Sequence, residues 1–257
     1  MNRFRNLTLG TTLAGLLLAA TPATADEWTW SVTPYAWATD VGIDVTLDDR
    51  QVVDEEITAE DLLEDLETIA QVRIEARKGR HGLFADLFDV TLADDDAEIA
   101  LPNGQGTVTL APEMGMTLAE LGGFFDPQGD GQGFQLLYGA RLLNERAEID
   151  ALFRRADGTT TATTYEIDDT FVDGLVGVRY IRRLGQHWEM EGKADISTGG
   201  TELTWSAGPS LRYSFGETGR YSATAGYRRM VVDFDTADNV DAKMTMSGFL
   251  VGLRISF

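Results

Sequence analysis

The sequence predicts an all-β fold: a transmembrane, antiparallel, up-and-down β-barrel of about ten strands, with eight or twelve strands as alternatives. Three observations support this prediction. Residues 249–257 alternate between an apolar face and a small or charged face, which suits a strand between lipid and a polar lumen. Earlier segments repeat this period-two alternation. Beyond the N-terminal segment the chain has no apolar run of about 18 residues, so a membrane span would have to be a closed barrel.

The N-terminal segment has the features of an export signal. Arg3 and Arg5 precede a short apolar run at 13–20, and Ala23-Thr24-Ala25 forms an A-x-A cleavage site. Residues 1–25 are therefore predicted to be a signal peptide, and residues 26–257 an outer-membrane β-barrel. Removal of the signal would change the net charge from −21 to −23, because the segment contains two arginines and no acidic residue.

Ten strands are predicted after the signal peptide. In order, they cover residues 28–39, 67–79, 82–92, 107–125, 133–152, 170–183, 187–198, 202–215, 220–235 and 241–257. An even number returns the last strand to the side where the first began. The compact connections are expected at the periplasmic end, and the mostly longer, acidic ones at the outer end. These compact connections are residues 79–82, 126–132, 184–187 and 216–219.

For two of these strands, the sequence does not decide which face points into the barrel. In the ninth, regular alternation would place Arg229 against lipid, which is costly near the bilayer midplane. A bulge near Arg229 would instead turn three apolar residues outward: Met230, Val232 and Phe234. In the third strand, Asp86 shares a face with two aromatic residues, Phe84 and Phe88, so either face could be the inner one.

The predicted inner faces carry many charges. A glycine precedes an arginine on several of them, which leaves space for a guanidinium group that can pair with carboxylates. This lumen charge lattice is predicted to contain Arg73, Glu75, Arg77, Arg141, Asp173, Arg179, Glu189, Glu191, Lys193, Asp195, Arg212, Arg228 and Arg254. Two interpretations remain: an electrostatic plug that makes a small barrel rigid, or a charged constriction that selects an anionic solute.

A short helix is predicted in the first outer loop. Thr58 and Asp61 form a capping-box-like start, followed by an apolar stripe of Leu62, Leu63 and Leu66. The helix could be a solvated element folded over the rim, or a lid or partner-docking element. Acidic residues that precede it could bind divalent cations near the lipopolysaccharide surface, but their spacing matches no calcium loop, so solvation is expected for them: Asp40, Asp44, Asp48, Asp49, Asp54, Glu55, Glu56 and, in the second loop, Asp94, Asp95 and Asp96.

The sequence offers little for catalysis. Its two histidines, His81 and His187, lie in predicted periplasmic turns, and neither has a Ser or Asp partner at a recognisable spacing. The chain has no cysteine, which excludes thiol chemistry and disulfides. Carboxylate-only catalysis stays open, but the expectation is a non-enzyme without cofactor or metal.

Aromatic residues cluster at the strand ends that are assigned to the periplasmic interface, where amphipathic rings are favoured: Trp28, Trp30, Trp188, Tyr213, Phe215, Tyr221 and Phe257. Tyr35 and Trp37 instead share a face with Thr29 and Thr33. They are therefore expected to point inward, either to pack in the lumen or to stack on a ligand.

Several short stretches, in this order and spacing, resemble a family of uncharacterised proteobacterial outer-membrane β-barrel proteins. They are residues 34–37, 75–80, 82–87, 138–141, 176–179, 226–229 and 252–257. The resemblance covers essentially the whole mature chain, and implies a location and a fold but no activity. The terminal Phe257 after an alternating strand is similar to the signal that the barrel-assembly machinery reads.

The expected function is that of an integral outer-membrane β-barrel, structural or surface-interacting, with a charge-filled lumen and no catalysis. Its expected partners are outer-membrane lipid, lipopolysaccharide and, during biogenesis, the barrel-assembly machinery; the strong acidity argues against nucleic acid. One alternative is a narrow channel for small solutes, or for apolar ones through a lateral opening. Another is a soluble periplasmic ligand-binding barrel.

Overall fold

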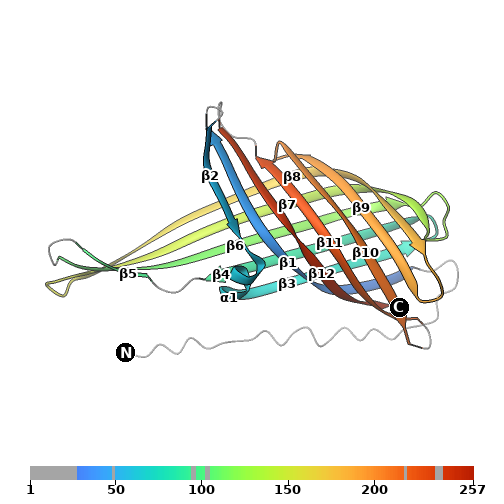
Figure 1. The fold of residues 1–257 in the computed structure, drawn as a ribbon, viewed down its shortest axis with the longest axis horizontal. Coiled ribbons are helices and arrows are strands. Elements are labelled where there is room, and N and C mark those ends of the chain that lie inside the picture. The colour runs from blue at the N-terminus through green and yellow to red at the C-terminus, as the bar shows by residue number, and fades with distance from the viewer. Residues whose placement is uncertain (1–27, 48–49, 94–96, 102–104, 217–218, 235–239) are drawn as a thin grey trace.

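Ten antiparallel strands form a closed barrel in the computed structural model, which describes residues 28–47, 50–93, 97–101, 105–216, 219–234 and 240–257 (Figure 1). The predicted signal peptide and the acidic residues 48–49 and 94–96 lie outside these ranges. The barrel strands are β1 (Thr29–Leu47), β3 (Leu66–Lys78), β4 (His81–Ala93), β6 (Gly106–Phe125), β7 (Gly133–Arg155), β8 (Thr160–Arg183), β9 (Trp188–Gly199), β10 (Leu203–Phe215), β11 (Tyr221–Phe234) and β12 (Val240–Ser256).

Each barrel strand pairs with its neighbours in the chain, and β12 pairs with β1 to close the ring, from Ser31 opposite Ser256 to Leu47 opposite Val240. The predicted ten-stranded barrel is therefore confirmed. Two further strands form where the sequence indicated loops. They are β2 (Arg50–Ile57), which pairs with the second half of β1, and β5 (Ala97–Ala100), which pairs with β6.

Pro34 marks the place where β1 changes partner. Residues Thr29 to Pro34 of β1 pair with β3, and from Val41 onward β1 pairs with β2 instead. Proline has no backbone N–H to donate to a ladder. Just beyond it, the N–H of Trp37 donates to the side-chain Oε1 of Gln71 on β3, at 2.6 Å. The side chain of Gln71 thus replaces a backbone acceptor where the two strands separate.

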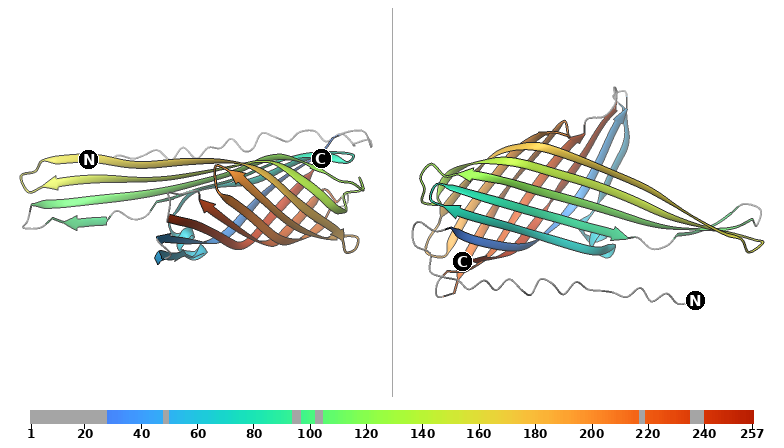
Figure 2. Two further views of the ribbon diagram at one scale, coloured as in Figure 1. Left: turned by 90° about the horizontal axis from the view of Figure 1, so that it is seen from above. Right: turned by 180° about the vertical axis from the view of Figure 1, so that it is seen from behind.

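Three strands continue beyond the barrel as a sheet (Figures 1 and 2), and of these β7 ends three residues later and β8 begins ten residues earlier than predicted. This projecting sheet consists of the first part of β6, the last part of β7, the first part of β8, and β5. Residues 160–164 of β8 are mostly threonine, which favours strands without giving an apolar periodicity. β9 pairs with β8 only between Asp173 and Arg183.

The outer face of the barrel is apolar. Leu121, Val176 and Phe249 point outward and are 69%, 56% and 73% exposed. Rings are also exposed near the turns that join β9 to β8 and β10 to β11, among them Trp188 and Phe215. We call this the turn end of the barrel, and the opposite end, where α1 lies, the helix end.

The pairing of β11 is regular, so of the two alternatives for this strand the regular alternation holds and the bulge near Arg229 does not form. Its register with both β10 and β12 continues without a shift through this residue. Arg229 therefore stays on the outer face, where it is exposed, and Met230 and Val232 point inward and are fully buried. The reason is that the interior at the helix end is apolar, so these side chains have partners there. On β4, Phe84 and Phe88 are buried inside, with Asp86 between them on the same face.

The helix α1 (Ala59–Glu64) has the predicted capping box, in which Thr58 and Asp61 each accept from the other's backbone. Ala59 N–H donates to Asp40 Oδ1 at 2.8 Å, which ties the helix to β1. Leu62 packs against the interior, but Leu66 belongs to β3, since the helix ends two residues earlier. Asp40 and Asp44 likewise lie in β1 and not in a loop, and Asp54 and Glu56 lie in β2. Within the described ranges, no helix has the length and apolar character to cross a membrane.

Candidate functional site: the barrel interior

The interior charges form two clusters. One, the Glu75 cluster, lies toward the turn end and consists of Arg73, Glu75, Asp86, Arg179, Glu189, Glu191, Arg212 and Arg254. The other, the Glu120 cluster, consists of Glu120, Arg141, Lys193, Asp195 and Arg228. Both join strands from opposite sides of the barrel.

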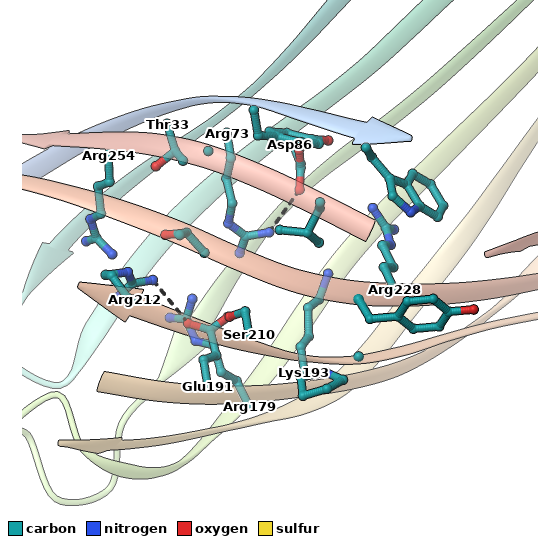
Figure 3. A pocket seen from close by; sticks show the side chains of 18 of the residues that line it. Thr33, Arg73, Asp86, Arg179, Glu191, Lys193, Ser210, Arg212, Arg228 and Arg254 are labelled. Carbon is teal, nitrogen blue, oxygen red and sulfur yellow. Dashed lines mark hydrogen bonds and ion pairs between the residues drawn. The ribbon is translucent and has the colours of Figure 1, made fainter. Parts of the chain in front are cut away.

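Glu75 is the centre of the first cluster. Its carboxylate is 2.8 Å from Arg73 and 2.6 Å from Arg179, with Arg254 at 3.9 Å. Arg73 also contacts Asp86 at 3.0 Å, and Arg212 pairs with Glu191 (Figure 3). Arg212 pairs with Glu189 as well. The Arg179–Glu75 pair connects β8 with β3 across the lumen, so it ties together strands that do not pair in the sheet.

The carboxylate of Glu120 contacts three basic side chains. Arg141, Lys193 and Arg228 lie 2.6, 3.0 and 3.3 Å from its carboxylate. Arg141 also contacts Asp195 at 2.5 Å, and the side chains of Glu120 and Arg141 are 2% and 1% exposed. At such burial each ion depends on its partners, because water does not solvate it.

The register of the sheet explains how these side chains meet. Glu120 on β6 lies opposite Asp86 on β4 and opposite Arg141 on β7, and Arg141 lies opposite Asp173 on β8. Four inward-facing charged residues, one on each of β4, β6, β7 and β8, therefore lie side by side at one height of the barrel. On β8, Gly177 leaves room for Asp195, its partner on β9, because a Cβ there would come within 2.6 Å of the Asp195 side chain.

The charges of the interior balance. The bases are Arg73, Arg141, Arg179, Lys193, Arg212, Arg228 and Arg254, and an equal number of acids faces them: Glu75, Asp86, Glu120, Asp173, Glu189, Glu191 and Asp195. The net charge of −21 for the whole chain thus comes from residues outside this set. An arrangement that neutralises itself presents no ring of one sign to a passing ion.

Two predicted lattice residues lie at the margins of these clusters. Asp173 accepts hydrogen bonds from the backbone N–H groups of Gly200 and Thr201, and from the hydroxyls of Ser197 and Thr201. It therefore holds the β9–β10 turn, and reaches Arg141 only through Ser197. Arg77 lies at the turn end and pairs with Asp126 at 2.7 Å, away from the Glu75 cluster.

Asp126 organises the turn between β6 and β7. Its carboxylate accepts from the backbone N–H groups of Gln128, Gly129 and Gly131, and its side chain is 0% exposed. Burial alone would raise the pKa of Asp126, but the hydrogen bonds from Gly129 and Gly131 and the charge of Arg77 outweigh it, so that its pKa is lowered. The ionised form is therefore the one that the fold stabilises.

We expect Asp126→Asn to destabilise the protein by roughly 1–3 kcal/mol at pH 7, because buried donors lose a charged acceptor. The pKa of Asp126 is lower in the folded state than in the unfolded state, where it is about 4. The ionised carboxylate therefore contributes its full stabilisation above about pH 4, and this contribution is lost as the pH falls through the folded-state pKa. The difference in unfolding free energy between the two proteins should therefore shrink below about pH 4. Urea unfolding at pH 7 and pH 3 measures it. A difference that stays constant over this range would contradict the assignment, and Asp130→Asn in the same turn is the control.

Sequence reasoning missed several interior residues. Glu120, Asp86 and Gln135 were not predicted as lattice members, although Gln135 Oε1 accepts two bonds from Arg179, at 2.9 and 2.7 Å. Alternation on β6 would have placed Glu120 inward, in step with Leu118 and Phe124, but its partners follow only from the register between strands.

Among the described residues, three cavities follow one another along the interior of the barrel. A turn-end cavity of about 240 Å³ and a middle cavity of about 140 Å³ share a wall formed by Glu75, Arg179, Glu191, Arg212 and Arg254 (Figure 3). A helix-end cavity of about 310 Å³ is separated from the middle cavity by Trp37, which lines both. Arg228 lies over the Trp37 ring at 4.8 Å and connects this second wall to the Glu120 cluster.

A buried apolar cluster surrounds Trp37. It joins Phe88, Leu118 and Leu143 from β4, β6 and β7 to residues from the opposite strands β11 and β12: Met230, Val232, Met244 and Met246. Apolar side chains from the two sides of the barrel therefore contact one another across the lumen at this height. Tyr35 points inward as well and donates to Asp86 at 2.9 Å.

The two histidines lie near the turn end. His81 packs against Phe125, with 5.1 Å between ring centroids, and His187 Nδ1 lies 3.1 Å from the carbonyl oxygen of Ser214. Among the described residues, no three His, Cys, Asp or Glu side chains are grouped as metal ligands would be.

No protein-family model and no curated protein matches the sequence. Similar solved structures include the outer membrane protease OmpT from Escherichia coli, with 8% identity over 92% of this chain and 99% of that one and a TM-score of 0.46. Ail, the attachment invasion locus protein of Yersinia pestis, has 11% identity over 90% and 98% of the chains and a TM-score of 0.30. The toluene transporter TodX of Pseudomonas putida has 7% identity over 90% and 89%, and a TM-score of 0.34. At these values the likeness says nothing about activity or ligand.

Proposed function

We propose that the protein is an integral outer-membrane β-barrel with a closed, non-conducting lumen, which acts through its surface and not as a pore or an enzyme. The observation that supports this proposal is that side chains meet across the lumen at two heights. Charged pairs do so between the turn-end and middle cavities, and the apolar cluster around Trp37 does so between the middle and helix-end cavities.

The outer wall supports a place in lipid. Large apolar side chains point away from the barrel on β6, β8 and β12, where water would be an unfavourable neighbour: Leu121, Val172, Val176, Phe249 and Val251. Exposed Trp30, Trp188 and Phe215 near the turn end suit the interfacial depth that aromatic rings prefer. A soluble periplasmic barrel would have to leave this surface in water.

Backbone hydrogen bonds continue the β1–β12 seam as far as Phe257, the residue that we propose the barrel-assembly machinery reads. Phe257 N–H donates to Trp30 O and Phe257 O accepts from Trp30 N–H, both at 2.9 Å. Phe257 thus takes part in the β1–β12 seam that closes the barrel. In this proposal the wall contacts outer-membrane lipid, and lipopolysaccharide surrounds the helix end.

The neutral interior favours a plug over an anion-selective constriction. A selective constriction works through an excess of one charge at the narrowest point. Here each arginine of the Glu75 cluster faces carboxylates of the same cluster, and the pairs Arg179–Glu75 and Arg228–Glu120 cross the lumen. They are better suited to hold the wall strands together.

Planar-bilayer recording tests the proposal. We expect refolded wild-type protein, shown to be folded by heat-modifiable migration on a gel, to give no steady openings. Arg179→Ala should be silent too, because the Trp37 wall remains. The triple variant Arg179→Ala/Trp37→Ala/Met246→Ala, which removes side chains from both walls, should conduct. Steady wild-type openings that change in Arg179→Ala would overturn the plug and favour the channel.

A further inference from the structure

The helix-end cavity differs from the other two in being lined mainly by apolar groups. Side chains from β1, β3, β4, β6 and β12 form its wall, and Leu62 and Leu63 of α1 form its rim. Its volume of about 310 Å³ is at the lower end of the range for small-molecule pockets, which starts at about 300 Å³. Leu63 is 61% exposed, so the rim continues the apolar lining toward the outside.

Two buried donors in this lining have no partner among the described residues. They are Nε1 of Trp37 and Nε2 of Gln71, on side chains that belong to residues 3% and 8% exposed. The orientation of the Gln71 amide is fixed, because its Oε1 accepts the Trp37 backbone N–H at 2.6 Å. Its NH₂ group therefore remains available as a donor. Buried donors are nearly always satisfied in proteins, so two of them on one cavity call for an acceptor.

The charges around the cavity decide the kind of acceptor. Glu145, Asp169 and Arg146 also line it, which gives one more acid than base. An anionic ligand would meet this excess, and the charge of the whole chain is strongly negative as well. An uncharged oxygen satisfies the two donors without this repulsion.

We propose that the helix-end cavity binds a neutral, largely apolar small molecule that carries one hydrogen-bond-accepting oxygen, such as a ketone, an ester or an ether. The oxygen accepts from Trp37 Nε1 and Gln71 Nε2, and the apolar part extends toward Leu62 and Leu63. This site is independent of conduction, because the Trp37 wall separates it from the middle cavity.

Fluorescence titration with prodan, a neutral naphthalene that carries a ketone, tests the site in protein reconstituted into nanodiscs. We expect saturable binding to the wild type beyond that of protein-free discs. Ala147→Trp fills the cavity and should abolish saturable binding, and Ala140→Trp, on the outer face of the same strand, should not. Heat-modifiable migration verifies that each variant is folded.

The role of the donors is tested by Trp37→Phe, which keeps an aromatic ring and removes the N–H. It should weaken prodan binding by about threefold to tenfold, the usual net value of one hydrogen bond. The binding of 2-dimethylaminonaphthalene, which lacks the ketone, should not change. Prodan binding that is unsaturable, or equal in Ala147→Trp, would overturn the site. Equal binding to wild type and Trp37→Phe would overturn the acceptor, and tighter binding of 2-naphthoate than of prodan would overturn the neutral class.

Discussion

Glu120→Gln is expected to destabilise the barrel by roughly 3–5 kcal/mol, the usual cost of removing one partner from a buried ion pair. Arg141, Lys193 and Arg228 all contact this carboxylate, and Asp195 is the only other acid of the cluster to face them. The amide keeps the shape of the side chain but supplies no charge. Urea unfolding in lipid vesicles, followed by tryptophan fluorescence, measures the effect.

Glu113→Gln is the matched control, because Glu113 lies on the same strand and is exposed. It should change the unfolding free energy by less than about 0.5 kcal/mol. If Glu120→Gln were no more destabilising than Glu113→Gln, the Glu120 cluster would not hold the barrel together. A further check is Arg228→Met, which leaves Glu120 with two bases and should cost less than the loss of Glu120 itself.

Asp173→Ala is expected to cost roughly 2–4 kcal/mol, because four hydrogen bonds converge on this buried carboxylate. Thr201 N–H would lose its acceptor in a site where Thr201 is 3% exposed. The β9–β10 turn should then exchange its amide hydrogens faster than the turn between β6 and β7. Hydrogen exchange, together with urea unfolding, measures both effects.

Glu202→Ala changes an exposed side chain in the same turn and should be nearly neutral. The loss of unfolding free energy in Asp173→Asn should lie between the losses in Glu202→Ala and Asp173→Ala, since an amide oxygen can accept some of the four hydrogen bonds. A similar loss in Glu202→Ala and Asp173→Ala would show that the turn tolerates no substitution, and that the carboxylate has no special part in it.

Period-two alternation predicted the barrel well because each inner residue of a strand is followed by an outer one. The ten strands and the inward facing of Arg141 and Arg179 follow from this alone. Alternation does not tell whether the inner face is polar at every height. The outward alternative for Met230 and Val232 arose because apolar side chains were assigned to lipid, whereas both are buried inside.

The contacts of the interior could not be predicted, because they depend on register and on distances across the lumen. Glu75 and Arg179 are 104 positions apart, and Arg228 and Glu120 are 108 apart. No local pattern links such residues. The helix-end cavity is similar: it brings together residues from the two ends of the chain, and its unpartnered donors depend on where β1 leaves β3.

The projecting sheet leaves one side of β8 without a neighbouring strand over residues 160–172, since β9 pairs only from Asp173 onward. Such a row of free backbone donors and acceptors can act as a template for another chain. A second copy that paired there in antiparallel register about Ile167 would bring Glu166 opposite Asp168, and like charges directly opposite one another repel. Glu166 and Asp168 would therefore disfavour this pairing, and would do so least where salt screens their charges.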